Sequence, residues 1–560
     1  MSVSGGPYPF ERGRVRRSTG LSGGRARVLA RHAGPSADFA DAANIAEAHA
    51  RQTAKAAILP SALAKSASSQ RNGSLPSPIL NAGPLPAILL QNIRPDLSAS
   101  TLLWPWQKAV LCMLALAALA SLWLAPNVVL PVATVLFAGS FLAVLVLRVM
   151  ACANLLTGGV ESERAVGVRP ALLSDARCPT YAVLVPLYDE AEVVPGLVAA
   201  LERLDYPKHK LAISFIVETS DAKTREAFAR QDLPPHMRVI VAPPGVPRTK
   251  PRALNFALAQ TPGRLVVVFD AEDLPEPDQL RRAVVTFARA PGSVACLQSR
   301  LNTINPYESF LSRHFTLEYS VLFDLLLPAL ERIGFPIPLG GTSNHFRRTA
   351  LEAALAWDPH NVTEDADLGI RLARFGMKVG VLASTTWEDA PVTYKVWRGQ
   401  RTRWLKGWMQ TYIVHMRQPW RLMSELGVWP FIGFQLLMGS MIASALVHPW
   451  FYLLLGMELV VGNAFVQPED GVVRILWWLA VCNLALGYLS AMGIAVVAAI
   501  RRGRPWLAMH VVTLPVYWLL ISLAAHRALR ELVVAPHYWE KTAHRARPLT
   551  TPPARQTQPR

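Results

Sequence analysis

Residues 264–273 read RLVVVFDAED, an apolar run that ends in three carboxylates. Such a run is typical of a strand that is buried on both faces of a parallel sheet. Other apolar runs lie at 181–187, 211–217 and 237–241, and helical patterns lie between them at 191–204 and 253–260. Strands that alternate with helices predict a Rossmann-like α/β domain with a mostly parallel sheet.

Polar side chains follow three of these strands at their ends. They are Tyr188-Asp189-Glu190, Glu218-Thr219-Ser220-Asp221 and Asp270-Ala271-Glu272-Asp273. Ligands bind at the carboxyl ends of strands in such sheets, so we expect these side chains at one site. The carboxylates of the third group suit Mg²⁺ or Mn²⁺, which keep open positions for phosphate oxygens. The alternative for this third group is an ordinary acidic turn.

Long uncharged stretches flank the α/β region. Two precede it, at 109–125 and 128–147, and each is long enough to cross a hydrocarbon core of about 30 Å. Further apolar regions follow, at 428–465, 475–500 and 506–525. We therefore expect a polytopic membrane protein with about six membrane-associated segments of open topology. The first 100 residues hold no apolar run of signal-peptide type.

The expected organisation has five parts. They are a disordered basic cytoplasmic tail over 1–100, a transmembrane hairpin over 101–150, a cytoplasmic catalytic domain over 151–425, transmembrane or interfacial helices over 426–530, and a basic tail over 531–560.

The net charge of +18 is concentrated beside the apolar segments, for example at 398–406 and 501–504. This distribution favours contact with anionic membrane lipids, and no nucleic-acid partner is expected. The five cysteines form no C-x-x-C pair, so we expect neither a disulfide framework nor a thiolate metal site. The catalytic region should face a reducing compartment.

Further polar groups lie between the membrane segments. Lys250, beside a helix start, suits a diphosphate or is surface charge. Thr363-Glu364-Asp365 favours a helix N-terminus, and a carboxylate there can also act as a general base. The stretch 340–345 is a glycine-rich turn that allows close backbone approach to a ligand. Gln400-Arg401-Thr402-Arg403-Trp404 suits a diphosphate and a sugar ring, or a juxtamembrane belt.

The ordered set DAED, TED and QRTRW between membrane helices resembles the processive family 2 glycosyltransferases. Cellulose synthase and bacterial beta-glucan synthase catalytic subunits are examples of this family. The resemblance covers residues 178–410 by motif, and it implies a GT-A-type domain that binds a nucleotide sugar with Mg²⁺ or Mn²⁺. The segment 539–544 also resembles one near the end of some bacterial members, with no chemical role assigned to it.

The resemblance implies a role for each matching residue. Asp270 and Glu272 match the metal-binding pair, although Asp273 follows directly, so the second ligand stays open. Asp365 matches the catalytic base, with Thr363 and Glu364 beside it. The remaining positions match groups that bind the nucleotide sugar or its diphosphate (Asp189, Glu218, Lys250, Asp270, Arg401, Arg403) and the acceptor (Gln400, Trp404). The sequence has Glu-Thr-Ser at 218–220 where the family has Asp-Asp-Gly, so the nucleobase and the donor sugar stay open.

The expected function is inverting transfer from a UDP-hexose, such as UDP-glucose, to a growing polysaccharide, with export through the chain's own helices. Accessory export proteins are compatible partners, and the expected location is the bacterial inner membrane. One alternative is a non-processive transferase that makes a glycolipid. Another is a non-catalytic membrane receptor or scaffold with a degenerate transferase domain.

Overall fold

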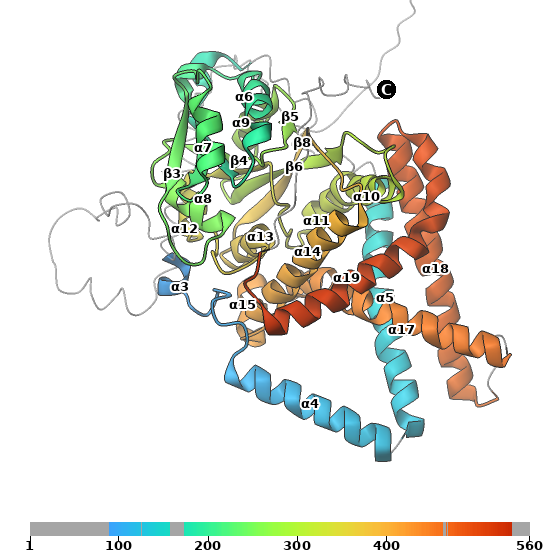
Figure 1. Ribbon diagram of the computed structural model, residues 1–560. Helices are drawn as coiled ribbons and strands as arrows, with labels where there is room; N and C mark the ends of the chain where they lie inside the picture. Colours follow the sequence, from blue (N-terminus) through green and yellow to red (C-terminus); the bar gives the residue numbers. More distant parts are fainter. Residues whose placement is uncertain (1–88, 125, 157–172, 463–465, 467–468, 540–560) are drawn as a thin grey trace, which may run out of the picture.

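The computed structural model describes residues 89–124, 126–156, 173–462, 466 and 469–539 (Figure 1). Most of the predicted basic tails, at 1–88 and 540–560, therefore lies outside the described residues. The centre of the molecule is one eight-stranded sheet in the order β3-β2-β1-β4-β7-β6-β8-β5.

The four predicted strands form the parallel half of this sheet. They are β1 (Tyr181–Leu187), β2 (Leu211–Glu218), β3 (Met237–Ala242) and β4 (Leu265–Val268). The mostly parallel α/β sheet expected from the sequence is thereby confirmed. Each strand is apolar at successive positions because the sheet is covered on both faces: Leu184 packs in one core, and Val183 and Val185 pack in the other.

The other half of the sheet contains strands that are not predicted from the sequence. They are β5 (Leu274–Pro275), β6 (Val294–Thr303), β7 (Asn344–Arg347) and β8 (Lys378–Glu388). Strand β7 runs antiparallel to both β4 and β6, whereas β6 and β8 are parallel. Strand β6 carries polar side chains such as Gln298 and Asn302, which are fully buried and hydrogen-bonded. Because these side chains interrupt the apolar sequence, β6 does not appear as an apolar run.

Helices cover both faces of the sheet. In the α/β domain they are α6 (Val194–Glu202), α7 (Ala222–Ala229), α8 (Lys250–Leu258), α9 (Gln279–Arg289), α12 (Arg348–Ala353) and α13 (Glu364–Arg374). Single 3-10 turns lie at η2 (Asp175–Arg177), η3 (Ala191–Val193) and η4 (Lys208–Lys210). The predicted helix at 191–204 thus consists of η3 followed by α6, and the predicted helix at 253–260 starts three residues earlier, at Lys250.

A second layer of helices lies between the α/β domain and the apolar bundle. It contains α10 (Phe310–Val321), the π-helical turn η5 (Leu322–Leu326), α11 (Leu327–Ile333), α14 (Tyr394–His415) and α15 (Pro419–Leu426). In Figure 1, α14 lies between α13 of the α/β domain and α19 of the bundle, and it contacts both. The short helix α3 (Leu89–Ile93) leads into this layer from the N-terminal side.

The apolar helices are α4 (Pro105–Leu124), α5 (Pro126–Leu156), α16 (Val428–Phe434), η6 (Gln435–Gly439), α17 (Ser440–Val461), α18 (Gly471–Arg501), η7 (Pro505–Thr513) and α19 (Leu514–Val534). Within the described residues, three helical stretches are long and apolar enough to cross a membrane: Val428–Val461, Gly471–Arg501 and Pro505–Val534. These stretches indicate a membrane protein.

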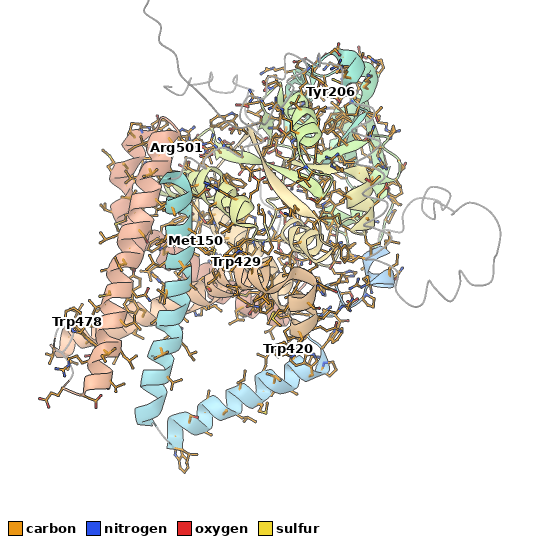
Figure 2. The ribbon with its side chains drawn as sticks, turned by 180° about the vertical axis from the view of Figure 1, so that it is seen from behind. Met150, Tyr206, Trp420, Trp429, Trp478 and Arg501 are labelled. Carbon is orange, nitrogen blue, oxygen red and sulfur yellow. The ribbon has the colours of Figure 1, made fainter. Side chains whose placement is uncertain are left out.

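The arrangement of the apolar helices departs from the simple expectation in two places. The apolar region 428–465 is just long enough for two short spans, but 428–461 is one continuous helical stretch. Helices α4 and α5, expected as a tight hairpin, diverge from their common end, whereas α5 lies beside α18 (Figure 1). Seen from behind, Met150 of α5 and Arg501 at the end of α18 lie on the side of the α/β domain, and Trp478 lies towards the opposite end (Figure 2).

Candidate active site

A cavity of about 340 Å³ lies at the carboxyl ends of the parallel strands. Its walls come from the segments after β1, β2 and β4, from the N-termini of α8 and α13, from the glycine-rich turn before β7, and from one face of α14. The predicted residues that line it are Glu218, Lys250, Asp270, Glu272, Thr363, Glu364, Asp365, Gln400, Arg403 and Trp404. The lining does not include Asp189, Asp273 or Arg401.

The acidic turn after β4 separates two kinds of carboxylate. Asp270 and Glu272 line the cavity, whereas Asp273 is only 1% exposed and lies beneath the turn. Asp273 Oδ2 accepts a hydrogen bond from the backbone N–H of Asp270 at 2.7 Å and another from the hydroxyl of Thr342. Burial raises the pKa of Asp273 well above its ordinary value, and the neighbouring carboxylates raise it further. Asp273 therefore stabilises the turn from beneath, and Asp270 and Glu272 are the carboxylates of this turn that line the cavity.

Lys250 is the first residue of α8 and reaches across the cavity to this turn. Its Nζ donates to Asp270 Oδ1 at 2.5 Å and to the carbonyl oxygen of Gly341 at 2.9 Å. Burial favours the neutral amine, but the carboxylates of Asp270 and Glu364 outweigh burial and raise the pKa of Lys250. The ammonium is therefore charged at neutral pH and lies where a phosphate oxygen can accept from it.

The end of the cavity near β2 is shaped by an ion pair and an aromatic ring. Glu218 accepts from Arg252 Nη2 with both carboxylate oxygens, at 3.1 and 3.0 Å, and both side chains are buried. The guanidinium of Arg248 lies 5.0 Å from the ring centre of Tyr188. Asp189, with φ at 54°, is exposed and is not part of this lining, and its backbone N–H donates to Asp221 Oδ2.

The TED segment begins α13, as its residue types predict. Glu364 is buried, and Asp365 is partly buried and accepts from the N–H of Ala366 at 2.7 Å. Burial raises the pKa of both carboxyls, that of Glu364 to about 8, with Asp365 adding to the effect on Glu364. The positive charges of Lys250 and Arg403 lower the pKa of both carboxyls and so oppose the effect of burial. For Asp365, the lowering by Lys250 is larger than the raising by Asp270.

Gly341 lies between the two carboxylates that the sequence places in different motifs. A Cβ atom at this residue would lie 3.3 Å from Asp365 Oδ2 and 3.9 Å from Asp270 Oδ2. The glycine therefore allows the acidic turn and the TED segment to face each other across a narrow space. Close approach of the turn at 340–345 to a ligand stays a prediction.

Helix α14 presents two different faces. Gln400, Arg403 and Trp404 are spaced i, i+3 and i+4, so they share the face that lines the cavity. Gln400 Oε1 and Arg403 Nε are buried and have no hydrogen-bond partner among the described residues. The indole of Trp404 stacks with Tyr319, with ring centres 6.3 Å apart and planes at 18°. A polar ligand bound beside the Trp404 ring could form hydrogen bonds with these two buried atoms.

Arg401 was expected to bind the diphosphate, and the structure gives it other contacts. One residue further along α14 than Gln400, it turns away from the cavity and forms two hydrogen bonds to Glu318 of α10, at 2.7 and 2.5 Å. It also donates to the hydroxyl of Tyr517 of α19 at 3.1 Å. This buried arginine joins α14 to α10 and α19, because a helix rotates each successive side chain by about 100°.

Several lining residues were not identified from the sequence. Glu388 ends β8 and therefore follows the strand-end rule, but β8 itself was not predicted. Tyr319 and Trp408 lie on helices whose aromatic residues have no distinctive spacing. Trp539 stands at the start of a segment noted for its resemblance, without an assigned role.

Known proteins are similar to this chain over the region that contains the cavity. A model of the glycosyltransferase like family 2 matches residues 179–407, the stretch that supplies almost the whole cavity lining. Beta-monoglucosyldiacylglycerol synthase of Synechocystis sp. is 31% identical over 282 residues, which are 48% of this chain and 57% of that protein. Probable glucomannan 4-beta-mannosyltransferase 1 of Arabidopsis thaliana is 28% identical over 240 residues, 41% of this chain and 43% of that protein.

The chain thus spans about half the length of these curated relatives. Among solved structures, the mannosyltransferase PcManGT from Pyrobaculum calidifontis, in complex with GDP-Man and Mn²⁺, matches at a TM-score of 0.41 and 18% identity. That match covers 69% of this chain and 99% of that one.

Proposed function

We propose that this chain transfers a sugar from a nucleoside diphosphate to an acceptor hydroxyl with inversion, a reaction consistent with the match of residues 179–407 to a model of the glycosyltransferase like family 2. The observation that carries the proposal is the narrow space at Gly341. Carboxylates from the acidic turn and from the TED segment both lie within 4 Å of the position that a Cβ would occupy there. A group that activates the acceptor and a group that holds the donor thereby face one small volume.

Asp365 is the general base of the proposed reaction. It takes the proton of the acceptor hydroxyl as the oxygen attacks the anomeric carbon, and the bond to the diphosphate breaks on the opposite side. Its raised pKa strengthens it as a base, because a stronger base accepts the proton more readily once it is ionised. Burial raises the pKa of Glu364 to about 8, and the neighbouring Asp365 contributes to this rise, so Glu364 favours its protonated form beside the proposed base.

Asp270 and Glu272 are the proposed ligands of Mg²⁺ or Mn²⁺. Among the described residues no group of three or more His, Cys, Asp or Glu side chains is placed to hold a metal ion. Two carboxylates with open positions nevertheless fit a hard cation that also binds diphosphate oxygens. When bound, the cation would neutralise charge on the leaving nucleoside diphosphate. In this arrangement Lys250, which now pairs with Asp270, also donates to the diphosphate.

Arg403 is assigned to the diphosphate of the donor, and Gln400 and Trp404 are assigned to the acceptor sugar. The guanidinium of Arg403 suits the charge that develops on the departing diphosphate. The indole of Trp404, beside Tyr319, offers a flat face for the acceptor sugar. Gln400 has an unpaired buried oxygen that accepts from a sugar hydroxyl. Thr363 packs against Gly407 and fixes the position of the TED segment.

The acceptor we propose first is a growing polysaccharide, and the donor is a UDP-hexose such as UDP-glucose. Support comes from the QRTRW order, from the aromatic pair at the acceptor end and from the likeness to a protein described as a glucomannan mannosyltransferase. The apolar helices then provide a route for export from a bacterial inner membrane, with the α/β domain in the cytoplasm.

A glycolipid product is the second candidate, and one observation favours it. The wall of the cavity contributed by η5 and α11 includes Leu322, Phe323 and Leu327, and these two elements pack against α5 of the apolar bundle. An aliphatic wall next to a membrane helix suits the acyl chains of a lipid acceptor better than a sugar ring. A relative described as a monoglucosyldiacylglycerol synthase adds to this candidate.

The test uses membranes that contain the full chain, supplied with radiolabelled UDP-glucose and other UDP-hexoses. Labelled product of high mass supports the polymerase, and labelled product that organic solvent extracts supports the glycolipid enzyme. Asp365→Asn should reduce either product by about 10³-fold. The matched control is Glu352→Gln, which removes a carboxylate from an intrahelical ion pair with Arg348 on α12. If Asp365→Asn keeps its activity, Asp365 is not the base and the proposed reaction is wrong. If the wild type forms neither labelled product, a scaffold function becomes the better explanation.

A further inference from the structure

The chain returns to the active site after its last apolar helix. Helix α19 ends at Val534, and Figure 1 shows the following segment turning from the end of α19 up towards α13 and α14. The described part of this segment is 535–539, which we name the C-terminal strap. It ends with Trp539 in the lining of the cavity.

Side chains on one face of α14 hold the strap. Lys406 is buried, and its Nζ donates to the carbonyl oxygen of Tyr538 at 2.7 Å and to Glu531 of α19 at 3.1 Å. Gln410, one turn further, donates to the carbonyl oxygen of Pro536 at 2.8 Å. The positions 403, 406 and 410 are spaced i, i+3 and i+7, so Arg403 lies on the same face, directly before these two anchors.

A second anchor comes from the loop before the TED segment. Nδ1 of His537 lies 3.0 Å from the carbonyl oxygen of His360, and the two imidazole rings meet edge to face at 5.6 Å. The strap is therefore fixed to both of the elements that carry the proposed chemistry, α14 and the segment leading into α13. The backbone carbonyls of Pro536 and Tyr538 are hydrogen-bonded, as expected of a segment with a defined position.

Trp539 meets Arg403 at the edge of the cavity. The centre of the guanidinium lies 4.9 Å from the centre of the indole ring, within the range of a cation–π contact. Arg403 Nε is buried without a hydrogen-bond partner among the described residues. Nε of Arg401 is likewise without a hydrogen-bond partner in the described part of the chain, but two hydrogen bonds from its Nη atoms to Glu318 fix its orientation. The indole of Trp539 is thus the aromatic ring that contacts the Arg403 guanidinium among the described residues.

We infer that Trp539 is a positioning residue for sugar transfer: it stacks on the guanidinium of Arg403 and directs its N–H groups towards the diphosphate of the donor. A guanidinium donates in its own plane, so a ring that covers one face leaves the donating edge free. This inference rests on the proposed function, because it requires a diphosphate at Arg403. It also implies that α19 is coupled to the site through Lys406.

The test compares Trp539→Ala with Trp539→Phe in full-length chain reconstituted in vesicles, at varied UDP-glucose. We expect Trp539→Ala to raise KM for UDP-glucose and the inhibition constant for UDP by about tenfold, and Trp539→Phe to restore both to within about twofold. The melting temperature should stay the same, and Trp420→Ala on α15, where the indole is 78% exposed, should leave all values unchanged. Equal damage from the alanine and phenylalanine variants would overturn the inference.

A double-mutant cycle with Arg403→Ala separates positioning from a general packing effect. If Trp539 acts through Arg403, replacing it in the Arg403→Ala background changes the inhibition constant for UDP less than twofold. A full tenfold effect in that background would refute the inference. Lys406→Met should reproduce the behaviour of Trp539→Ala, because it releases the strap. Loss of turnover in Asp365→Asn is the test of the proposed function and does not depend on any of these results.

Discussion

Gly407 offers the sharpest test of the packing between α14 and the TED segment. A Cβ atom at this residue would lie 2.2 Å from Oγ1, 2.5 Å from Cγ2 and 2.7 Å from Cβ of Thr363. Ordinary contacts between such atoms begin near 3.4 Å, so in Gly407→Ala the helix and the segment must separate by about 1 Å. Thr363 cannot turn aside, because it is buried and its N–H is bound to Asn361.

The separation should affect the reaction more than the stability. Arg403 lies one turn before Gly407, so it moves relative to Asp365, and a misplacement of about 1 Å costs about 10²-fold in rate. The overlap destabilises the fold by about 1–3 kcal/mol, and the higher helix propensity of alanine offsets up to about 1 kcal/mol of this. We therefore expect a rate about 10²-fold lower and a melting temperature only a few degrees lower.

The assay is the initial rate of sugar transfer from radiolabelled UDP-glucose by solubilised protein, with the melting temperature measured on the same preparation. Gly456→Ala is the matched control, because Gly456 is also a helical glycine and an added Cβ would meet nothing within 4 Å. A Gly407→Ala protein with the rate of the wild type would refute the reasoning. The same result would show that the α14 contact does not set the geometry of the site.

Three further outcomes are expected. Gly341→Ala should lower turnover at least tenfold with little change in melting temperature, because the added methyl group lies between the carboxylates of Asp270 and Asp365. The measurement is kcat of this variant, in which both aspartates are kept. Chelation by EDTA should abolish transfer, Mn²⁺ or Mg²⁺ should restore it, and Asp270→Asn should prevent the restoration, as the same rate assay will show. Glu364 is neutral when folded up to about pH 8, so its contribution to stability should be full below pH 4.5 and be lost as the pH rises towards 8; melting temperatures of the wild type and Glu364→Gln across that range should converge at low pH and diverge at high pH.

The strands of the parallel half of the sheet can be predicted from the sequence because each is marked by its own run of apolar residues. A strand buried on both faces must be apolar at consecutive positions, so runs such as LVVV in β4 reveal themselves without knowledge of their neighbours. The strand-end rule then places Asp270 and Glu218 near one another, as observed. The N-terminus of α13 follows from Thr363 and the acidic residues after it, which favour the first turn of a helix.

The strands β6, β7 and β8 depend on partners that the local sequence does not reveal. Strand β7 is only four residues long and pairs antiparallel with β4 and β6, and the buried polar side chains of β6 are satisfied by residues that are distant in sequence. The difference between Glu272 and Asp273 has the same origin. Adjacent carboxylates look alike in the sequence, but the hydroxyl of Thr342, from another strand connection, fixes Asp273 beneath the turn. Trp539 reaches the site only because α19 packs along α14.

The QRTRW stretch at 400–404 contains residues of two kinds, which lie on two different faces of α14: some line the cavity, and Arg401 packs against other helices. The Arg403 face of α14 lines the cavity, and its Arg401 face joins α10 and α19 through Glu318 and Tyr517. Anything that moves α19 therefore acts on the helix that holds the proposed diphosphate ligand. The apolar helix α19 is then part of the active-site support, because the matched domain 179–407 contains Arg401 and Glu318 but not Tyr517. An excised α/β domain would keep its sheet, its acidic turn and the Arg401–Glu318 contact but lose the contact of α14 with α19.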